Sequence, residues 1–154
     1  MELQGAIGLA QLEKLKYILT KQKEHKTRIK EGIKSITSIE FRTLPDPNGD
    51  ASDTLIFFVD TRENAEKFAK ALVGKGLGTK NLPDALDWHF AGTWKHIYYD
   101  YPEYKGKDLE AVWNQSASFL RRAIAIPIMV NMSDEQINNI INTIKEVSNN
   151  LFDA

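Results

Sequence analysis

The first 33 residues constrain the fold of this chain more than any other segment. Between Glu2 and Ile33 the sequence contains no proline and is rich in Leu, Lys, Glu and Gln, which all favour helix. Leu12, Leu15 and Ile29 recur within it at nearly helical spacing. At 1.5 Å per residue such a helix is about 50 Å long, which exceeds the diameter of a compact small domain. We therefore predict one long helix that extends beyond the domain to which it belongs.

The opening turns of this helix, ELQGAIGLAQLEKL (residues 2–15), carry apolar or small residues on every side. Each glycine there costs about 1 kcal/mol relative to alanine, unless another backbone must pass close by. Exposed apolar surface of this kind usually marks an interaction site. Two explanations stay open: either the natural polypeptide continues upstream with a body that covers these turns, or the turns form a homodimer interface. The residues concerned are Leu3, Gly5, Ile7, Gly8, Leu9 and Leu12.

The second half of the helix has a different character. Residues 21–30 are mostly polar, so we expect a solvated face with only a narrow buried seam. His25 falls on the expected solvated face and is given no functional role.

Two β-rich runs follow the helix. Residues 38–44 (SIEFRTL) and 54–60 (TLIFFVD) flank PDPNGDAS, whose Pro, Asn, Gly and Asp residues are typical of a turn. We predict a hairpin from these two strands. A third strand is expected over residues 122–128 (RAIAIPI), where Pro127 favours an edge strand or a strand terminus.

Two amphipathic helices complete the pattern. The first is expected over residues 61–73, with Asp60 and Glu63 as a pair similar to a capping box. The second begins at Ser133, with Gln136 as its capping partner and an apolar stripe that faces the core. The order of elements predicts an α+β fold, in which a long N-terminal helix is followed by a small antiparallel sheet with helices packed on one face.

Length and composition exclude several classes of protein. A chain of 154 residues has the size of one domain. The absence of cysteine excludes disulfides, thiolate nucleophiles and Cys-ligated metal sites. A net charge of −1 without a basic stripe argues against binding to nucleic acid. Because the sequence has no apolar run of about 18 residues and no signal peptide, we expect no membrane span and a cytoplasmic protein.

Residues 88–113 (WHFAGTWKHIYYDYPEYKGKDLEAVW) hold all three tryptophans and four of the five tyrosines. Each such ring can bury about 150–250 Å², so the segment is costly to leave in water. One interpretation is that the rings complete a small core under a long loop. Another is that they line a ligand site, where His89 and His96 supply hydrogen bonds or proton transfer. A metal site of Asp87, His89 and His96 is the weakest interpretation, because structural sites usually need four ligands.

The opening motif ELQGAIGLAQLEKL resembles the segment that begins the long interdomain helix in the DegT/DnrJ/StrS group of sugar aminotransferases. In that family it follows an Asn-x-Arg-Met-type loop. The later order is similar too, with a hairpin, a helix ending near GKGLGT, the aromatic region with its histidines, and RRAIAIPIMVNMSDEQINNIINTIKEV as closing strand, turn and final helix. The resemblance covers nearly all of this chain but less than half of a complete family member. LPDALDWHFAGTWKHI is most similar to the branch that acts on keto sugars such as octulosonates and nucleotide-linked deoxyhexoses.

The resemblance implies the small domain of a fold type I aminotransferase that depends on pyridoxal phosphate (PLP). Residues 1–34 would be the linking helix, packed on a missing large domain, and residues 35–154 the small C-terminal domain. Such enzymes are homodimers that move an amino group from an amino-acid donor such as glutamate to a keto sugar, and their Schiff-base lysine lies upstream of the opening motif. No lysine of this chain matches that lysine, and Lys75 and Lys80 fall in a turn region that we expect to be exposed to solvent. We therefore expect this chain alone to bind no PLP and to have no transaminase activity.

The resemblance also indicates where a sugar would lie, because small domains of this family cover the cofactor cleft. The substrate-side candidates are His89, Trp94 and His96, with Phe90, Gly92 and Thr93 shaping the loop. Arg121 and Arg122 have the chemistry to bind a carboxylate or phosphate, but ordinary ion pairs are the favoured interpretation. The alternative function is a stand-alone interaction or sugar-binding module that dimerises through its N-terminal helix.

Overall fold

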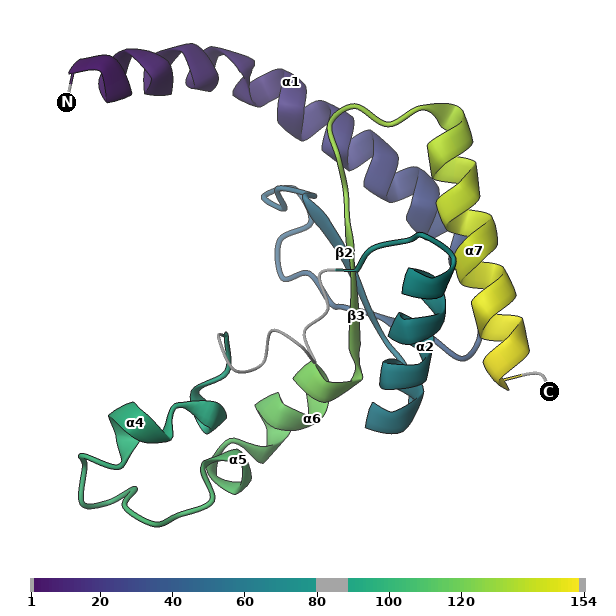
Figure 1. Ribbon diagram of the computed structural model, residues 1–154. Helices are drawn as coiled ribbons and strands as arrows, with labels where there is room; N and C mark the ends of the chain where they lie inside the picture. The colour runs from purple at the N-terminus through teal and green to yellow at the C-terminus, as the bar shows by residue number, and fades with distance from the viewer. Residues whose placement is uncertain (1, 80–88, 153–154) are drawn as a thin grey trace.

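The computed structural model describes residues 2–79 and 89–152. The long helix, the hairpin, the following helix, the third strand and the last helix come in the predicted order, and the fold is of the α+β class (Figure 1). The elements are α1 Glu2–Ile33, β1 Glu40–Phe41, β2 Thr54–Phe58, α2 Arg62–Gly74, the 3-10 turn η1 Ala91–Thr93, α4 Lys95–Tyr98, α5 Leu109–Val112, α6 Asn114–Arg122, β3 Ala123–Pro127 and α7 Asp134–Phe152.

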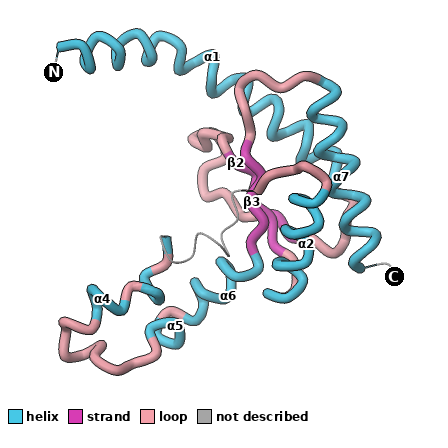
Figure 2. Tube along the Cα trace, viewed as in Figure 1, coloured by secondary structure: helices cyan, strands magenta, loops and turns pink. Residues whose placement is uncertain are grey.

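The three described strands form one antiparallel sheet in the order β1-β2-β3, of which Figure 2 labels β2 and β3. The hairpin of β1 and β2 confirms the prediction, although β1 has only two residues where a run of seven was expected. In the register of β2 with β3, Leu55 lies opposite Ile126 and Phe57 opposite Ile124, so these apolar pairs share one face. Pro127 ends β3, which is an edge strand, as its sequence predicts.

Helices α1, α2 and α7 contribute to a single apolar core with that face of the sheet. The capping box of α7 is confirmed, since the Ser133 amide donates to Gln136 and the Gln136 amide donates to the Ser133 hydroxyl. The cap of α2 lies one residue later than predicted, because the Thr61 hydroxyl accepts the Asn64 amide at 3.1 Å. The core residues are Ile29, Ile33, Leu55, Phe57, Val59, Ala65, Phe68, Ala69, Leu72, Ile124, Ile126, Ile128, Ile137, Ile140, Ile144 and Val147.

The two halves of α1 have opposite surroundings. Residues 2–17 are exposed along their whole length, and in Figure 1 this half extends away from the sheet. The second half packs against α7, and Ile29 and Ile33 belong to the same core as the sheet. The predicted long helix is therefore present. The domain boundary at residue 34 stays a prediction.

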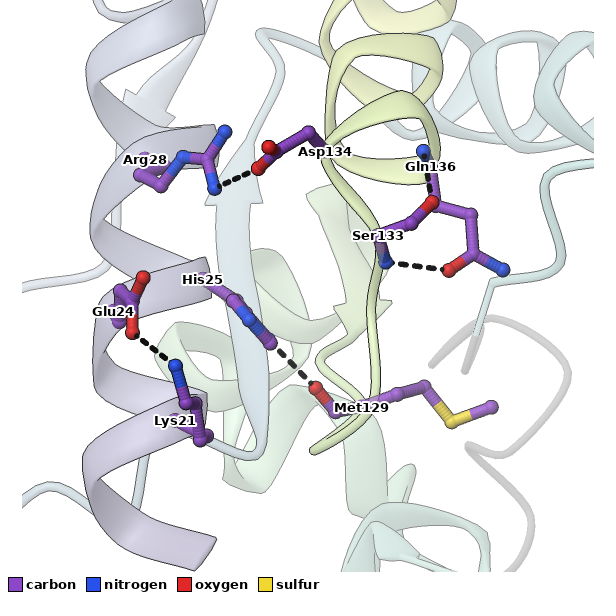
Figure 3. A network of polar contacts seen from close by, with 8 residues as sticks. All are labelled: Lys21, Glu24, His25, Arg28, Met129, Ser133, Asp134 and Gln136. Atoms are coloured by element: carbon purple, nitrogen blue, oxygen red, sulfur yellow. Dashed lines mark hydrogen bonds and ion pairs between the residues drawn. The ribbon is translucent and has the colours of Figure 1, made fainter. Parts of the chain in front are cut away.

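The expectation of a solvated His25 is wrong. Its side chain is buried, and the ring Nδ1 donates to the Met129 carbonyl at 3.0 Å (Figure 3). Nearby, Arg28 forms an ion pair of 2.6 Å with Asp134 at the start of α7, and the Gln22 side-chain Nε2 donates to the Ile128 carbonyl at 2.9 Å. These contacts fix α1 to the segment that links β3 to α7. The helix face that looked solvated in sequence is thus an interface within the domain.

A second, smaller cluster lies outside the main core. We call residues 89–122, which include η1, α4, α5 and α6, the aromatic arm. Within it the Trp113 ring lies 5.0 Å from Tyr98 and 5.8 Å from Tyr104, measured between centroids. Figure 1 shows the arm projecting from the sheet, with α6 leading directly into β3 and contacting α2. None of the helices within residues 2–79 and 89–152 has the long apolar run that a membrane crossing needs.

Candidate substrate-side site

The loop residues of the predicted site form one fixed turn at the start of the aromatic arm. Phe90 is 4% exposed and packs with Ala117. Its carbonyl accepts hydrogen bonds from the Thr93 amide at 3.0 Å and from the Thr93 hydroxyl at 2.8 Å. Gly92 is buried against the Phe90 ring so closely that an added Cβ would lie 2.3 Å from a ring carbon. The turn therefore requires glycine at position 92.

The three candidates for substrate contact lie next to this turn in the sequence. His89 and His96 are exposed, whereas Trp94 is half-buried. The Trp94 carbonyl accepts the amides of Ile97 and Tyr98, both at 3.0 Å, and so starts α4. The turn thus presents two imidazoles at the surface on a backbone fixed by hydrogen bonds. Their roles toward a substrate stay predictions.

Other rings of the arm pack next to this turn, since Trp113 joins the cluster of Phe90 and Ala117. Tyr98, Tyr104 and Trp113 pack on one another, and the Tyr99 hydroxyl donates to the Lys107 carbonyl at 3.0 Å. These rings complete a small local core, as the first interpretation of the aromatic segment predicts. His89 and His96 stay exposed in this arrangement, and their imidazoles can hydrogen-bond a ligand.

A metal centre gains no support in the part of the chain that the structure describes, where no three His, Cys, Asp or Glu side chains gather. Asp87, the third member of the ligand set considered from sequence, lies outside the described residues.

Arg121 and Arg122 have partners within the domain. The Arg121 guanidinium pairs with both carboxylate oxygens of Glu110. Arg122 donates to the Val59 carbonyl at 2.9 Å and lies over the rings of Phe58 and Phe119. Both arginines therefore have structural roles that join α6 to neighbouring elements.

Sequence reasoning missed a polar site between α1 and the β1–β2 hairpin. The Asp50 carboxylate there lies 2.6 Å from the Lys26 ammonium and 3.7 Å from the Arg42 guanidinium, and it accepts the Ser52 hydroxyl at 2.9 Å. Burial raises the pKa of Asp50, but hydrogen bonds from Lys26 and Ser52 and the two nearby positive charges hold it below its usual value. The signal in the sequence was the spacing of Lys23, Lys26 and Lys30, which places them on one helix face.

The described lysines do not fit the role of a Schiff-base residue. Among them only Lys26 is buried, and its side-chain nitrogen is engaged by the Asp50 carboxylate at 2.6 Å, whereas a Schiff-base lysine must be free to attack the cofactor. Lys14, Lys16 and Lys75 are exposed. Lys80 lies outside the described residues.

Solved structures with a similar fold come from sugar-modifying aminotransferases. Spr1654 of Streptococcus pneumoniae, assigned as a sugar aminotransferase, matches in its PLP form with a TM-score of 0.73 and 20% identity, over 99% of this chain and 36% of its own. PseC of Helicobacter pylori, an aminotransferase involved in the biosynthesis of pseudoaminic acid, has a TM-score of 0.69 and 16% identity, over 97% of this chain and 38% of its own. The sugar aminotransferase CalS13 of Micromonospora echinospora has a TM-score of 0.64 and 20% identity, over 92% and 34%.

This chain therefore spans about a third of the length of these structures, with 34–38% of each covered. At such low identity the likeness shows the fold alone. The family is shown by sequence, because the profile of the DegT/DnrJ/EryC1/StrS aminotransferases matches residues 1–145. That range includes the opening motif, the aromatic segment and most of the last helix. The chain belongs to the DegT/DnrJ/EryC1/StrS aminotransferase family.

Proposed function

We propose that this chain is the small C-terminal domain of a PLP-dependent aminotransferase that moves an amino group from an amino-acid donor to a keto sugar or a nucleotide-linked sugar. One observation carries the proposal: the family profile matches residues 1–145 of a chain that spans about a third of its solved relatives. A PLP form and a PMP form exist for one of those relatives, which supports PLP as the cofactor of full-length members. In the complete enzyme PLP would serve as the electron sink of the reaction.

The first half of α1 is the proposed contact with a large domain. Leu3, Leu9 and Leu12 are 74%, 68% and 63% exposed. Fully burying one such side chain contributes about 1.5–3 kcal/mol, so a body that covers several of them gains substantial free energy. A homodimer of the complete enzyme and a cytoplasmic location stay predictions from the family and the sequence.

The exposed turn of the aromatic arm is the proposed substrate contact. His89 and His96 would hydrogen-bond sugar hydroxyls, and Trp94 would offer an apolar face. Phe90, Gly92 and Thr93 fix the backbone that carries them. When a small domain closes over a cleft, it excludes water and orients the substrate.

A PLP-binding experiment on the purified chain tests whether the cofactor-binding lysine belongs to the other domain. We expect the purified chain to stay colourless with PLP and to lack the absorption band of lysine-bound cofactor, because Lys26, the one buried lysine among the described residues, is held by Asp50. A yellow complex with that band would contradict the proposal. The DNA upstream of the Met1 codon gives a second test, since an open reading frame for a lysine-containing domain is expected there.

The proposed substrate contacts are tested in the complete enzyme, with the large domain supplied by the upstream reading frame. We expect His89→Asn and His96→Asn to raise KM for the keto sugar while the cofactor band stays unchanged. Lys95→Gln is the matched control, because Lys95 is an exposed polar residue of the same segment. Wild-type KM values in both histidine variants would remove these residues from the site.

The exposed half of α1 also favours a second candidate function, a stand-alone module that dimerises through Leu3, Ile7 and neighbouring residues and binds sugars through the arm. Light scattering distinguishes the two. The module predicts a dimer that Ile7→Asp dissociates and that Gln11→Asp, at an exposed polar position of the same helix, leaves intact. A monomeric wild type, or no saturable change in Trp fluorescence with nucleotide sugars, would argue against the module.

A further inference from the structure

A cavity of about 250 Å³ lies between α1 and the β1–β2 hairpin, away from the aromatic arm. We call it the lysine pocket. Three lysines of α1 line one side, and the hairpin supplies the other. Its polar and aromatic lining includes Lys23, Lys26, Lys30, Phe41, Arg42 and Asp50.

Positive charge dominates the lysine pocket. Four cationic residues and two acidic ones line it, which gives a formal net charge of +2. One of the acids, Glu31, is engaged by Lys34 outside the pocket, and the other, Asp50, pairs with Lys26 at 2.6 Å. Among the described residues no carboxylate lies within ion-pair distance of Lys23 or Lys30. The pocket therefore holds more positive charge than its own acids neutralise.

The spacing of these lysines costs stability. Lys23, Lys26 and Lys30 are three and four residues apart on one helix, and like charges at such spacing destabilise a helix by a few tenths of a kcal/mol for each pair. The Lys30 ammonium lies 5.0 Å from the centre of the Phe41 ring, a contact that places the charge without neutralising it. An anion between the lysines and Arg42 would relieve this repulsion.

The floor of the pocket is built rigidly. Ser52 is 3% exposed and has a φ of 61°, which is unfavourable for a residue with a side chain, and its hydroxyl donates to the Asp50 carboxylate at 2.9 Å. Backbone strain of this kind persists where the surrounding structure fixes it, and it is often associated with functional sites. The ion pair of Lys26 with Asp50 thus forms a fixed floor, above which Lys23, Lys30 and Arg42 surround the cavity.

We propose that the lysine pocket binds a phosphoryl group, as inorganic phosphate or as the phosphate of a small ester, through Lys23, Lys30 and Arg42. The guanidinium fork of Arg42 matches the geometry of phosphate oxygens, and the two ammonium groups supply point charges. The cavity lies just below the roughly 300–1,000 Å³ of pockets for drug-sized ligands, so it suits a phosphate or a sugar phosphate rather than a whole nucleotide. The site does not depend on the proposed transaminase function.

Calorimetric titration of the 154-residue chain tests the proposal, with inorganic phosphate, glucose 1-phosphate and glucose as separate titrants at constant ionic strength. The pocket variant combines Lys23→Gln with Arg42→Gln. The matched control combines Lys14→Gln with Lys16→Gln, which removes the same charge from exposed positions of α1. We expect saturable phosphate binding by the wild type and the control, and a loss of about tenfold or more for each charge removed from the pocket.

Each possible result of the titration either supports or overturns phosphoryl binding in the lysine pocket. Binding of phosphate and glucose 1-phosphate assigns the phosphoryl group as ligand, and binding of phosphate alone assigns the free anion. If neither inorganic phosphate nor glucose 1-phosphate gives saturable heat, the proposal is overturned. An equal loss of phosphate affinity in the pocket variant and the control variant overturns it as well. Because Lys23 and Arg42 are exposed, their replacement leaves the core intact, which circular dichroism checks. Lys30→Arg keeps the charge and should keep binding.

Discussion

The ion pair of Lys26 with Asp50 connects α1 to the β1–β2 hairpin, and we expect Asp50→Ala to destabilise the domain strongly. The Lys26 residue is only 8% exposed, and the side chains of the pair are 10% and 14% exposed. Asp50 also receives the Ser52 hydroxyl and the charge of Arg42. Among the described residues Lys26 has no other carboxylate partner, so removing Asp50 leaves its ammonium buried and unpaired.

The size of the effect follows from the geometry. At 2.6 Å the attraction between two unit charges is about 6 kcal/mol with an effective dielectric constant of about 20. Removing both ions from water offsets most of that gain, so the pair contributes little net stability. Deleting one partner of a fully buried pair costs about 3–5 kcal/mol. Because the lysine pocket admits water to one side of Lys26, we expect a loss of about 2–3 kcal/mol for Asp50→Ala.

Urea unfolding at neutral pH measures this loss, with Lys26→Met and the double variant as companions. Lys26→Met should cost less than Asp50→Ala, because Ser52 and Arg42 still serve the remaining carboxylate. The double variant should be more stable than Asp50→Ala alone, since it leaves no buried charge unpaired. If the effects of the two single substitutions simply add, Lys26 and Asp50 do not act as a pair and the reasoning is refuted.

Acid provides a second measurement on the same pair. The pKa of Asp50 is lower in the folded state than its usual value, so the stability it contributes is present above the unfolded pKa of about 3.9. That contribution is lost as the pH falls through the lower folded pKa. The difference in unfolding free energy between the wild type and Asp50→Ala should therefore shrink below about pH 4. A difference that grows in acid would contradict this assignment.

Two glycines give further predictions. Gly32→Ala should destabilise the domain by about 1–2 kcal/mol in urea unfolding, because its Cβ would lie 2.6–2.9 Å from three side-chain carbons of Ile141, whose branched side chain is stiff. Gly5→Ala is its control and should not destabilise, since nothing lies within 4 Å of the added Cβ. Gly92→Ala should displace the Phe90 ring and change the near-ultraviolet circular dichroism of the arm while the main core stays folded.

The parts of the fold that sequence predicted well are those with local causes. The capping box of Ser133 and Gln136 lies within four residues, and the absence of proline over residues 2–33 permits one long helix. The turn between β1 and β2 is marked by its own Pro, Asn and Gly residues. In each case the residues that determine the structure are neighbours in sequence, so no knowledge of packing was needed.

The wrong prediction and the missed site both concern residues whose surroundings are formed by segments distant in the sequence. His25 is buried because Met129, 104 residues away, supplies a carbonyl for its ring. The lysine pocket depends on the ion pair between Asp50, in the loop of the hairpin, and Lys26 of α1, a pairing that helix periodicity alone does not reveal. For the candidate site, the aromatic setting and the family resemblance direct attention to His89 and His96, whose roles stay predictions. The sequence did not show which aromatic residues pack inside the arm and which side chains stay exposed. This division depends on how Tyr98 packs with its neighbours.

The first half of α1 has no buried residue to stabilise it. Most helices in proteins are stabilised by tertiary packing rather than by propensity, yet residues 2–17 are exposed throughout, and Gly5 and Gly8 weaken them by about 1 kcal/mol each. A body docked on this half would bury Leu3 and Ile7 and would order the first turns at the same time. The glycines have open space around them, so another backbone can approach α1 there. Gly5 and Gly8 destabilise the isolated helix, but they allow another backbone to approach it closely. Both effects favour a second domain on this surface.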